Sequence, residues 1–252
     1  MAFRFDLITL FPGLVRDVMT YGVVGRAVET GIVQVNSWNP RDYALDRHRN
    51  VDDSSYGGGP GMVMKAEPVD RALEAAFEAG ANGSVVYLSP QGRKVDHGLI
   101  EYTAAQSGLV LLAGRYEGVD ERVLEARVDQ EWSIGDFVVS GGELPALMIV
   151  DAVTRLLPGA LGDRQSAEQD SFSAGLLDYP HYTRPELYAG RTVPEVLTSG
   201  DHGRIARWRA KQALGRTWLR RPDLLRDAEL SAEQKQLLAE FKDEYEMPGR
   251  HC

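Results

Sequence analysis

Short apolar runs alternate with longer amphipathic stretches over the first two thirds of the chain. The apolar runs have the length and residue types of buried strands, which we predict at residues 3–10, 33–38, 85–88 and 109–113. The amphipathic stretches have helical spacing and predict helices at residues 68–79, 96–107 and 144–157. Strands that alternate with helices are typical of an α/β domain around a parallel sheet, here of roughly five or six strands.

The pattern changes between residues 161 and 175, where serine, glycine and charged residues replace the apolar runs. We predict a flexible linker there. Helical patterns resume at residues 203–219 and 231–246, and Ser231 followed by Glu233 and Gln234 is typical of a helix cap. The sequence therefore predicts an α/β domain of residues 1–160, a linker of residues 161–175 and a small all-helical domain of residues 176–252.

Composition narrows the class of protein. The chain has 252 residues, of which 43% are hydrophobic, and this is enough for a substantial core. We find neither an apolar stretch of roughly 18 residues that could span a membrane nor a signal peptide. The single cysteine, Cys252, excludes a disulfide framework and a thiolate metal cluster within the chain. We therefore expect a cytoplasmic protein without a membrane partner.

The net charge of −9 at first argues against a nucleic-acid partner, because phosphate groups attract local positive charge. The charge is unevenly distributed, however. Residues 201–222 carry seven Lys or Arg against one acidic residue, and much of the acidity lies between residues 223 and 246. The chain therefore remains compatible with RNA binding.

Three glycine-bearing turns could form a ligand pocket. Each follows an apolar run, and their sequences are SPQGR at 89–93, GRYEG at 114–118 and SIGDFVVSGGELP at 133–145. Ligands of α/β sheets bind beyond the carboxyl ends of the strands, where glycine lets backbone groups come close. One such turn would indicate only local turn chemistry, but three in one domain favour a pocket.

The standard phosphate-binding motifs are absent from the sequence. It contains neither the G-x-G-x-x-G of dinucleotide sites nor the G-x-x-x-x-G-K-[ST] of nucleoside triphosphate sites. We therefore expect a ligand recognised through its base, ribose and side chain, as S-adenosylmethionine would be.

A further glycine cluster, SSYGGGPGMVM, occupies residues 54–64. We predict that it holds neither a regular strand nor a helix. Two roles are open for it: a mobile surface loop, or a binding loop that closes over substrate. Arg47, His48 and Arg49 precede it and would attract phosphate.

Several long and uncommon strings are shared with one enzyme family. They include DRHRNVDDSSYGGGPGMVM, LLAGRYEGVDERV, EWSIGDFVVSGGELPALMIVDAVTRLLPG, QDSFSAGLLDYPHYTRP and RWRAKQALGRTWLRRPDLL. With VVYLSPQGRK they cover essentially residues 3–224. On these residues the chain resembles the bacterial tRNA (guanine-N1)-methyltransferases of the SPOUT superfamily.

The resemblance implies a homodimer whose cofactor domain contains a deep trefoil knot. It implies methylation of N1 of guanosine 37, immediately 3′ of the anticodon in tRNA, a modification that maintains the reading frame. It also implies S-adenosylmethionine in the knot, and Mg²⁺ as a further requirement of catalysis. The implied cofactor-binding residues are Tyr87, Leu88, Ser89, Pro90, Gly114, Tyr116, Glu117, Gly118, Ile134, Gly135, Asp136, Phe137, Val138, Val139, Gly141, Gly142, Leu144 and Pro145.

Methylation of guanine N1 requires a base, because this nitrogen carries a proton at neutral pH, and a cation that stabilises the charge developing on O6. The resemblance implies that Asp170 of the DSF motif is the base and that Arg155 is its cationic partner. It places Glu117 against the cofactor, the guanine or Mg²⁺. Without it, Asp170 would be read as a solvated linker residue, Arg155 as a helix-end cation and Glu117 as a helix cap.

The resemblance implies that each active site is shared, with the knot of one subunit beside the linker of the other. Arg204, Arg207 and Lys211 lie at helical spacing, so they form either a solvated helix face or part of a tRNA-binding strip with Arg220 and Arg221. We expect Trp208 and Trp218 in the core of the small domain, and we assign no role to His181 and His202.

Three alternative functions remain. The first is a related knotted methyltransferase that acts on another RNA position. The second is an RNA-binding protein with a degenerate pocket, which the intact turns disfavour. The third is a dehydrogenase, which the absence of the dinucleotide motif disfavours most strongly.

Overall fold

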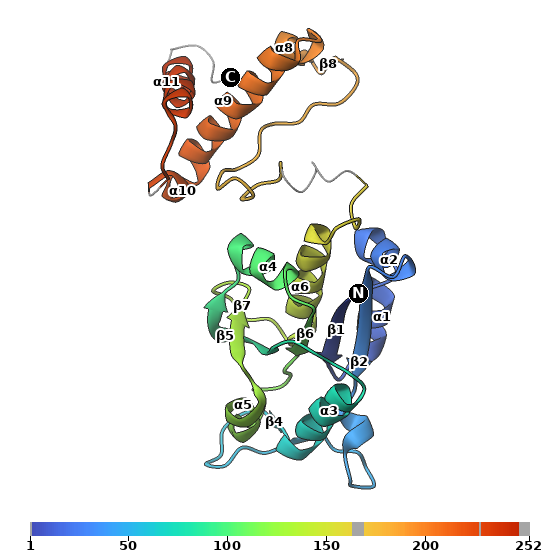
Figure 1. The fold of residues 1–252 in the computed structure, drawn as a ribbon. Helices are drawn as coiled ribbons and strands as arrows, with labels where there is room; N and C mark the ends of the chain where they lie inside the picture. The colour runs from blue at the N-terminus through green and yellow to red at the C-terminus, as the bar shows by residue number, and fades with distance from the viewer. Residues whose placement is uncertain (1, 163–168, 227, 247–252) are drawn as a thin grey trace. The chain divides into compact units, whose positions relative to one another are not determined.

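The computed structural model describes residues 2–162, 169–226 and 228–246. The chain divides after residue 164 into two compact units (Figure 1). We describe each unit by itself. Within the described residues, no helix combines the length and apolar character needed to cross a membrane.

A five-stranded parallel sheet forms the centre of the first unit. Its strands have the order β2-β1-β6-β5-β7. Their bounds are β1 Phe3–Ile8, β2 Val33–Trp38, β5 Val85–Lys94, β6 Gly108–Leu112 and β7 Gln130–Ser133. All five residues of the central strand β6 are buried, as expected for a strand covered on both faces. The four apolar runs are strands as predicted, and the sheet has the expected size.

Helices cover both faces of this sheet (Figure 1). One apolar core lies between the sheet and four helices, α1 Pro12–Val18, α2 Gly22–Glu29, α4 His97–Ala104 and α6 Glu143–Leu156. A second core lies between the opposite face and α3 Ala66–Glu78 and α5 Glu121–Arg127. Of these helices the sequence predicted α3, α4 and α6. It did not predict the short helices α1, α2 and α5.

Strand β5 is interrupted where its pairing with β7 shifts register between Leu88 and Arg93. The predicted strand at residues 85–88 therefore continues beyond the first glycine-bearing turn and pairs with β7 again. Gly92 lies so close to the backbone of Glu131 and Trp132 that a Cβ atom would clash there. The turn is thus anchored to β7 on both sides.

The glycine cluster at residues 54–64 corrects one prediction, because its last two residues form strand β4 Val63–Met64. This strand pairs antiparallel with β3 Asp52–Asp53. Met64 also donates a backbone hydrogen bond of 2.9 Å to Gly118 and accepts one of 3.0 Å from Asp120. The N–H and the carbonyl of Met64 are therefore both hydrogen-bonded, which fixes the end of this glycine-rich segment.

Two helices form the core of the second unit, α9 His202–Arg220 and α11 Ala232–Glu246, and both were predicted. Leu214 and Leu237 are buried between them. Ser231 and Gln234 form the reciprocal bonds of a capping box, as the sequence indicated. The remaining helices of this unit are short, α8 Glu195–Thr198 and α10 Asp223–Arg226. The unit also contains a β-hairpin of β8 Leu187–Tyr188 with β9 Arg191–Thr192, so the prediction of an all-helical domain was wrong on this point. A 3-10 helix, η1 Pro40–Tyr43, completes the first unit.

Candidate active site

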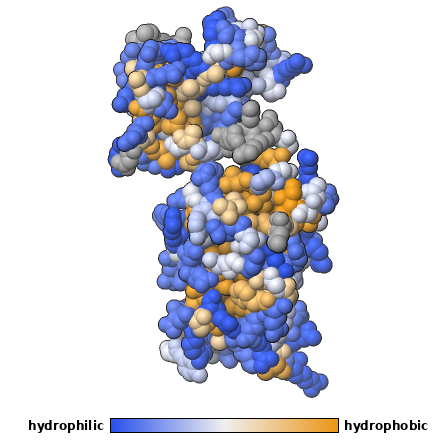
Figure 2. Space-filling view, in the orientation of Figure 1, coloured by the Kyte–Doolittle hydropathy of each residue, from blue (hydrophilic) through white to orange (hydrophobic). Residues whose placement is uncertain are grey.

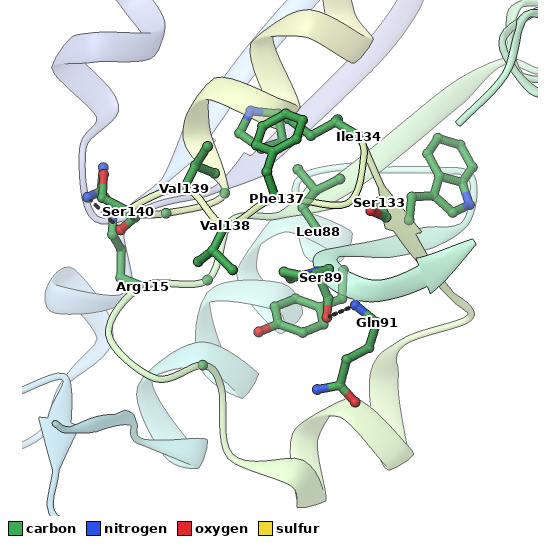
Figure 3. Close-up of a pocket in the computed structure, with 18 of the residues that line it drawn as sticks. Leu88, Ser89, Gln91, Arg115, Ser133, Ile134, Phe137, Val138, Val139 and Ser140 are labelled. Atoms are coloured by element: carbon green, nitrogen blue, oxygen red, sulfur yellow. Dashed lines mark hydrogen bonds between the residues drawn. The ribbon is translucent and has the colours of Figure 1, made fainter. Parts of the chain in front are cut away.

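The three glycine-bearing turns surround one cavity of about 300 Å³ (Figure 3). The first lies where the pairing of β5 shifts register, and the other two follow β6 and β7, at the same edge of the parallel sheet. The cavity is lined by Tyr87, Leu88, Ser89, Pro90, Gln91, Gly114, Arg115, Tyr116, Glu117, Gly118, Trp132, Ser133, Ile134, Gly135, Phe137, Val138, Val139, Ser140, Gly141, Gly142 and Pro145. The fold thus joins segments more than 40 positions apart in the sequence.

Two of the predicted cofactor residues, Asp136 and Leu144, do not line this cavity; all the others do. The Asp136 carboxylate is exposed and accepts a hydrogen bond of 2.5 Å from Lys94, at the end of β5. Leu144 lies on α6 with 56% of its surface exposed. The sequence reasoning missed Gln91, Arg115, Trp132, Ser133 and Ser140 as lining residues. Recognition of β7 would have indicated Trp132 and Ser133, because they end that strand.

The Tyr87 ring packs against the two glycines of the second turn. A Cβ atom on Gly114 would lie 2.9 Å from the Tyr87 hydroxyl, and one on Gly118 would lie 3.2 Å from it. Gly118 also has a φ of +135°, which side chains rarely adopt. Burial raises the pKa of the Tyr87 hydroxyl, while a backbone hydrogen bond from Val119 acts in the opposite direction. These glycines therefore leave room for a buried aromatic ring.

The third turn places an apolar wall on the cavity. Ser133 holds its start, because the Ser133 hydroxyl donates to the carbonyl of Gly135 at 3.0 Å and accepts from the N–H of Gly135 at 3.2 Å. The turn then presents Phe137, Val138 and Val139, which line the cavity and keep part of their surface exposed (Figure 3). Exposed apolar side chains beside a cavity are typical of a surface that a ligand covers.

Arg115 connects the second turn to the third. Its Nε donates to the buried Glu143 carboxylate at 2.7 Å, and its Nη1 donates to the Ser140 carbonyl at 3.1 Å (Figure 3). The guanidinium also lies 4.4 Å from the centre of the Phe11 ring. Thr9, at the end of β1, donates to the other Glu143 oxygen at 2.9 Å. Arg115 therefore joins the second turn to the third directly, and Glu143 links it in turn to Thr9 beyond β1.

Among the residues that the structure describes, Glu117 is the only acidic one that lines the cavity. Its backbone N–H donates to the Met62 carbonyl at 2.9 Å. A Cβ atom on Gly61 would clash with the Glu117 side chain, and Gly61 has a φ of +77°. The end of the glycine cluster therefore packs directly against this carboxylate.

The two remaining catalytic candidates belong to different units. Arg155 lies half-buried in the last turn of α6, and Asp170 lies exposed in a turn near the start of the second unit. Their joint action on one guanine stays a prediction. The predicted linker includes residues 163–168, which lie outside the described residues.

Neighbouring acids neutralise part of the basic segment of α9. Arg207 forms an ion pair with Glu240 at 2.6 Å, and Lys211 forms one with Glu244 at 2.7 Å. The predicted positive strip is therefore weaker than the sequence suggests. Trp208 and Trp218 are half-buried beside Tyr182 and Tyr245, so they complete the packing of the unit, as expected. His181, which had no assigned role, contacts the Asp178 carboxylate at 2.7 Å.

The cavity suits a ligand with aliphatic and cationic character. Its lining combines backbone groups of glycines, apolar side chains and the Glu117 carboxylate. Across residues 2–162, 169–226 and 228–246, no group of three or more His, Cys, Asp or Glu side chains could hold a metal ion.

Comparison with known proteins gives one consistent result. A family model described as "tRNA (Guanine-1)-methyltransferase TrmD" matches residues 3–227. A tRNA (guanine-N(1)-)-methyltransferase of Methylococcus capsulatus is 61% identical over 97% of this chain and 98% of its own length. One from Pseudomonas putida W619 is 60% identical over 94% of this chain and 96% of its own length. The crystal structure of tRNA (m1G37) methyltransferase from Aquifex aeolicus is similar with a TM-score of 0.73 and 38% identity, and the match covers 89% of this chain and 95% of that one.

We expect Tyr87 to ionise at a higher pH than an exposed tyrosine, because burial disfavours its phenolate. The folded state then binds this proton more tightly than the unfolded state. The resulting stabilisation is complete below the usual tyrosine pKa of about 10 and is lost as pH rises through the folded pKa.

The difference between the phenolate absorbance titrations of the wild type and Tyr87→Phe measures the pKa of Tyr87 directly. Tyr102→Phe, which removes the hydroxyl of an exposed tyrosine, is the control. A Tyr87 transition at or below pH of about 10 would contradict the expectation.

Proposed function

The chain belongs to the tRNA (guanine-1)-methyltransferase family TrmD, and we infer that it transfers a methyl group from S-adenosylmethionine to N1 of guanosine 37 in tRNA. The observation that supports this most directly is the single cavity built from the three predicted turns. Family membership also implies that a trefoil knot runs through this part of the chain. The match over nearly the whole chain disfavours the three alternative functions.

We propose that the cavity holds S-adenosylmethionine, which supplies a methyl group activated by a positively charged sulfur. Its residues fit this molecule. The apolar wall of Phe137, Val138 and Val139 can cover an adenosine, and glycine backbone groups can accept and donate hydrogen bonds to it. Glu117 gives the cavity a negative charge suited to a sulfonium. Asp136 and Leu144 would contribute backbone or neighbouring contacts only, because they do not line the cavity.

We propose that Asp170 accepts the proton from guanine N1 and that Arg155 stabilises the negative charge on O6. The nitrogen becomes nucleophilic as it loses this proton, so the carboxylate must lie within hydrogen-bond distance of it. The Asp170 side chain is exposed in the single chain. Bound RNA or a second subunit would therefore supply the burial that makes a carboxylate a stronger base.

We propose that the protein acts as a homodimer through the apolar face of α1 and α6, two helices that pack together. This face carries exposed large hydrophobic residues, namely Phe11, Leu14, Val18, Leu144 and Met148. Figure 2 shows apolar surface over α6 of the first unit. Monomeric proteins rarely expose contiguous apolar patches of this kind. Under this proposal the second copy supplies the Asp170 of the shared active site.

We propose that tRNA contacts exposed cations of α9. Within the described part of the chain, no ion pair involves Arg204 or Arg220, whereas Arg207 and Lys211 are neutralised by α11. Unpaired cations are the ones that can exchange counterions for phosphate groups. The glycine cluster, which packs against Glu117, is then a candidate for closing over the bound guanosine.

Mg²⁺ does not fit the described residues as a metal held by the protein alone. Glu117 is the single carboxylate at the cavity, and no cluster of ligating side chains accompanies it in the described chain. We therefore assign no step of the reaction to a metal ion.

The target position can be tested with unmodified tRNA transcripts. We expect methyl transfer to a transcript with guanosine at position 37, and none above background when adenosine replaces it, because the site must match the guanine O6 and N1–H pattern. Nucleoside analysis of the product identifies the methylated atom. Persistent transfer to the adenosine transcript would show that the assigned position is wrong.

The proposed base can be tested with Asp170→Asn. We expect turnover to fall at least about a hundredfold, because an amide cannot accept the N1 proton, while S-adenosylmethionine affinity stays unchanged. Single-turnover kinetics and equilibrium binding measure the two quantities. Asp243→Asn, an exposed carboxylate on α11 of the same unit, is the control. Near-normal turnover of Asp170→Asn would remove Asp170 as the base.

The proposed interface can be tested with Met148→Lys, which places a charge on the apolar face of α6. We expect the molar mass in solution to fall to that of one chain, and methyl transfer to fall with it, because the buried charge would lack a partner. Phe77→Lys is the control, since Phe77 is also an exposed apolar residue but lies on α3, across the sheet. Light scattering after size-exclusion chromatography measures the molar mass of each variant. An unchanged mass of the Met148 variant would contradict this interface.

A further inference from the structure

A buried carboxylate lies behind the cavity wall and does not face the cavity itself. Glu143 is the first residue of α6, and its side chain is completely buried. Each carboxylate oxygen has one partner: Thr9 donates to Oε1 at 2.9 Å, and Arg115 donates to Oε2 at 2.7 Å. A buried charge is strongly unfavourable unless such partners compensate it. The Arg115 guanidinium is therefore held in one place.

The fixed guanidinium lies between the second and third turns. Its Nη1 donates to the Ser140 carbonyl at 3.1 Å, and a Cβ atom on Gly141 would lie 2.2 Å from its Nε. The Phe11 ring covers it at 4.4 Å from the ring centre. The third turn can thus approach the second only as far as the guanidinium allows, and the hydrogen bond to Ser140 prevents it from moving away.

Each of these turns contributes a wall of the cavity, and a backbone hydrogen bond of 2.8 Å from Gly142 to Gly114 also joins them. Tyr116 and Glu117 follow Arg115 directly, and Val138 and Val139 precede Ser140 directly. A displacement of Arg115 would change the separation of the two walls. Such a change would affect the ligand held between them more than it affects tRNA contacts made by α9, which belongs to the other unit.

We propose that Glu143 is a positioning residue for methyl transfer, which acts through Arg115 and sets the width of the S-adenosylmethionine cavity. Thr9 has the supporting role of orienting the Glu143 carboxylate, and this links the cavity to the end of β1. The proposal rests on the proposed function, since it concerns the same cavity.

The test compares Glu143→Gln with a matched control, Asp6→Asn. Asp6 is also completely buried on β1 and is also paired with an arginine, Arg4, at 2.7 Å. It does not line the cavity. We expect S-adenosylmethionine to bind Glu143→Gln about tenfold more weakly or worse, because charge-assisted hydrogen bonds are among the strongest in proteins. We expect Asp6→Asn to bind it as the wild type does, although both variants lose stability.

Kinetics separate positioning from general destabilisation. In Glu143→Gln the KM for S-adenosylmethionine should rise by a similar factor while the KM for tRNA stays within about twofold. Equal changes in both KM values, or equal weakening in Asp6→Asn, would overturn the proposal. The conservative variant Thr9→Ser keeps the hydroxyl donor and should preserve affinity, whereas Thr9→Val should reduce it.

The outcomes distinguish the proposals from each other. If the wild type fails to bind S-adenosylmethionine, the proposed function is wrong. If the wild type binds and Glu143→Gln binds equally well, only the positioning role of Glu143 is wrong. If Glu143→Gln does not fold, Thr9→Val decides, and unchanged binding by that variant would overturn the proposal.

Discussion

The buried contact between Glu143 and Arg115 is the interaction on which the site depends most. The three turns belong to separate strands, and a turn rich in glycine has little intrinsic preference for one conformation. A carboxylate without access to water holds its cationic partner strongly, because the surrounding dielectric constant is low. Through Thr9, Ser140 and Phe11 this one contact connects the end of β1, the second turn, the third turn and the start of α6. The cavity therefore has a defined width although loops form much of its walls.

The residues with proposed functions are distributed over the two units of the chain. The first unit contains the cavity and Arg155, while the second contains Asp170 and the basic helix α9. Under the proposed function, the exposed apolar face of α1 and α6 is the dimer interface that this division requires. A second subunit on that face would complete the site, and the enzyme would methylate only where RNA and two chains meet. Such an arrangement would keep the methyl donor away from other nucleophiles until the correct guanosine is bound.

The sequence predicted the first two turns well because each combines glycine with a preceding apolar run, VVYL or LVLLA, and both signals are local. Helices α3, α4 and α6 were predicted because their amphipathic spacing is also a local signal. Strand β7 was missed because the sequence QEWS has no clear alternation, and its strand character arises from pairing with β5. Arg115 was missed as a wall residue because its role requires Glu143 and Ser140, more than 20 positions away. The proposed actions of Asp170 and Arg155 would depend on RNA and a second chain, so they stay predictions from the family resemblance.

Hydrogen exchange of the wild-type protein, with and without S-adenosylmethionine, tests most directly whether the three turns form one site. The cofactor should slow exchange of backbone amides in residues 87–91, 114–118 and 134–142 together, since each segment contributes to the same cavity. Peptides of α9 and α11 should be unaffected in the absence of tRNA. Protection confined to one turn, or found in the second unit alone, would contradict the account.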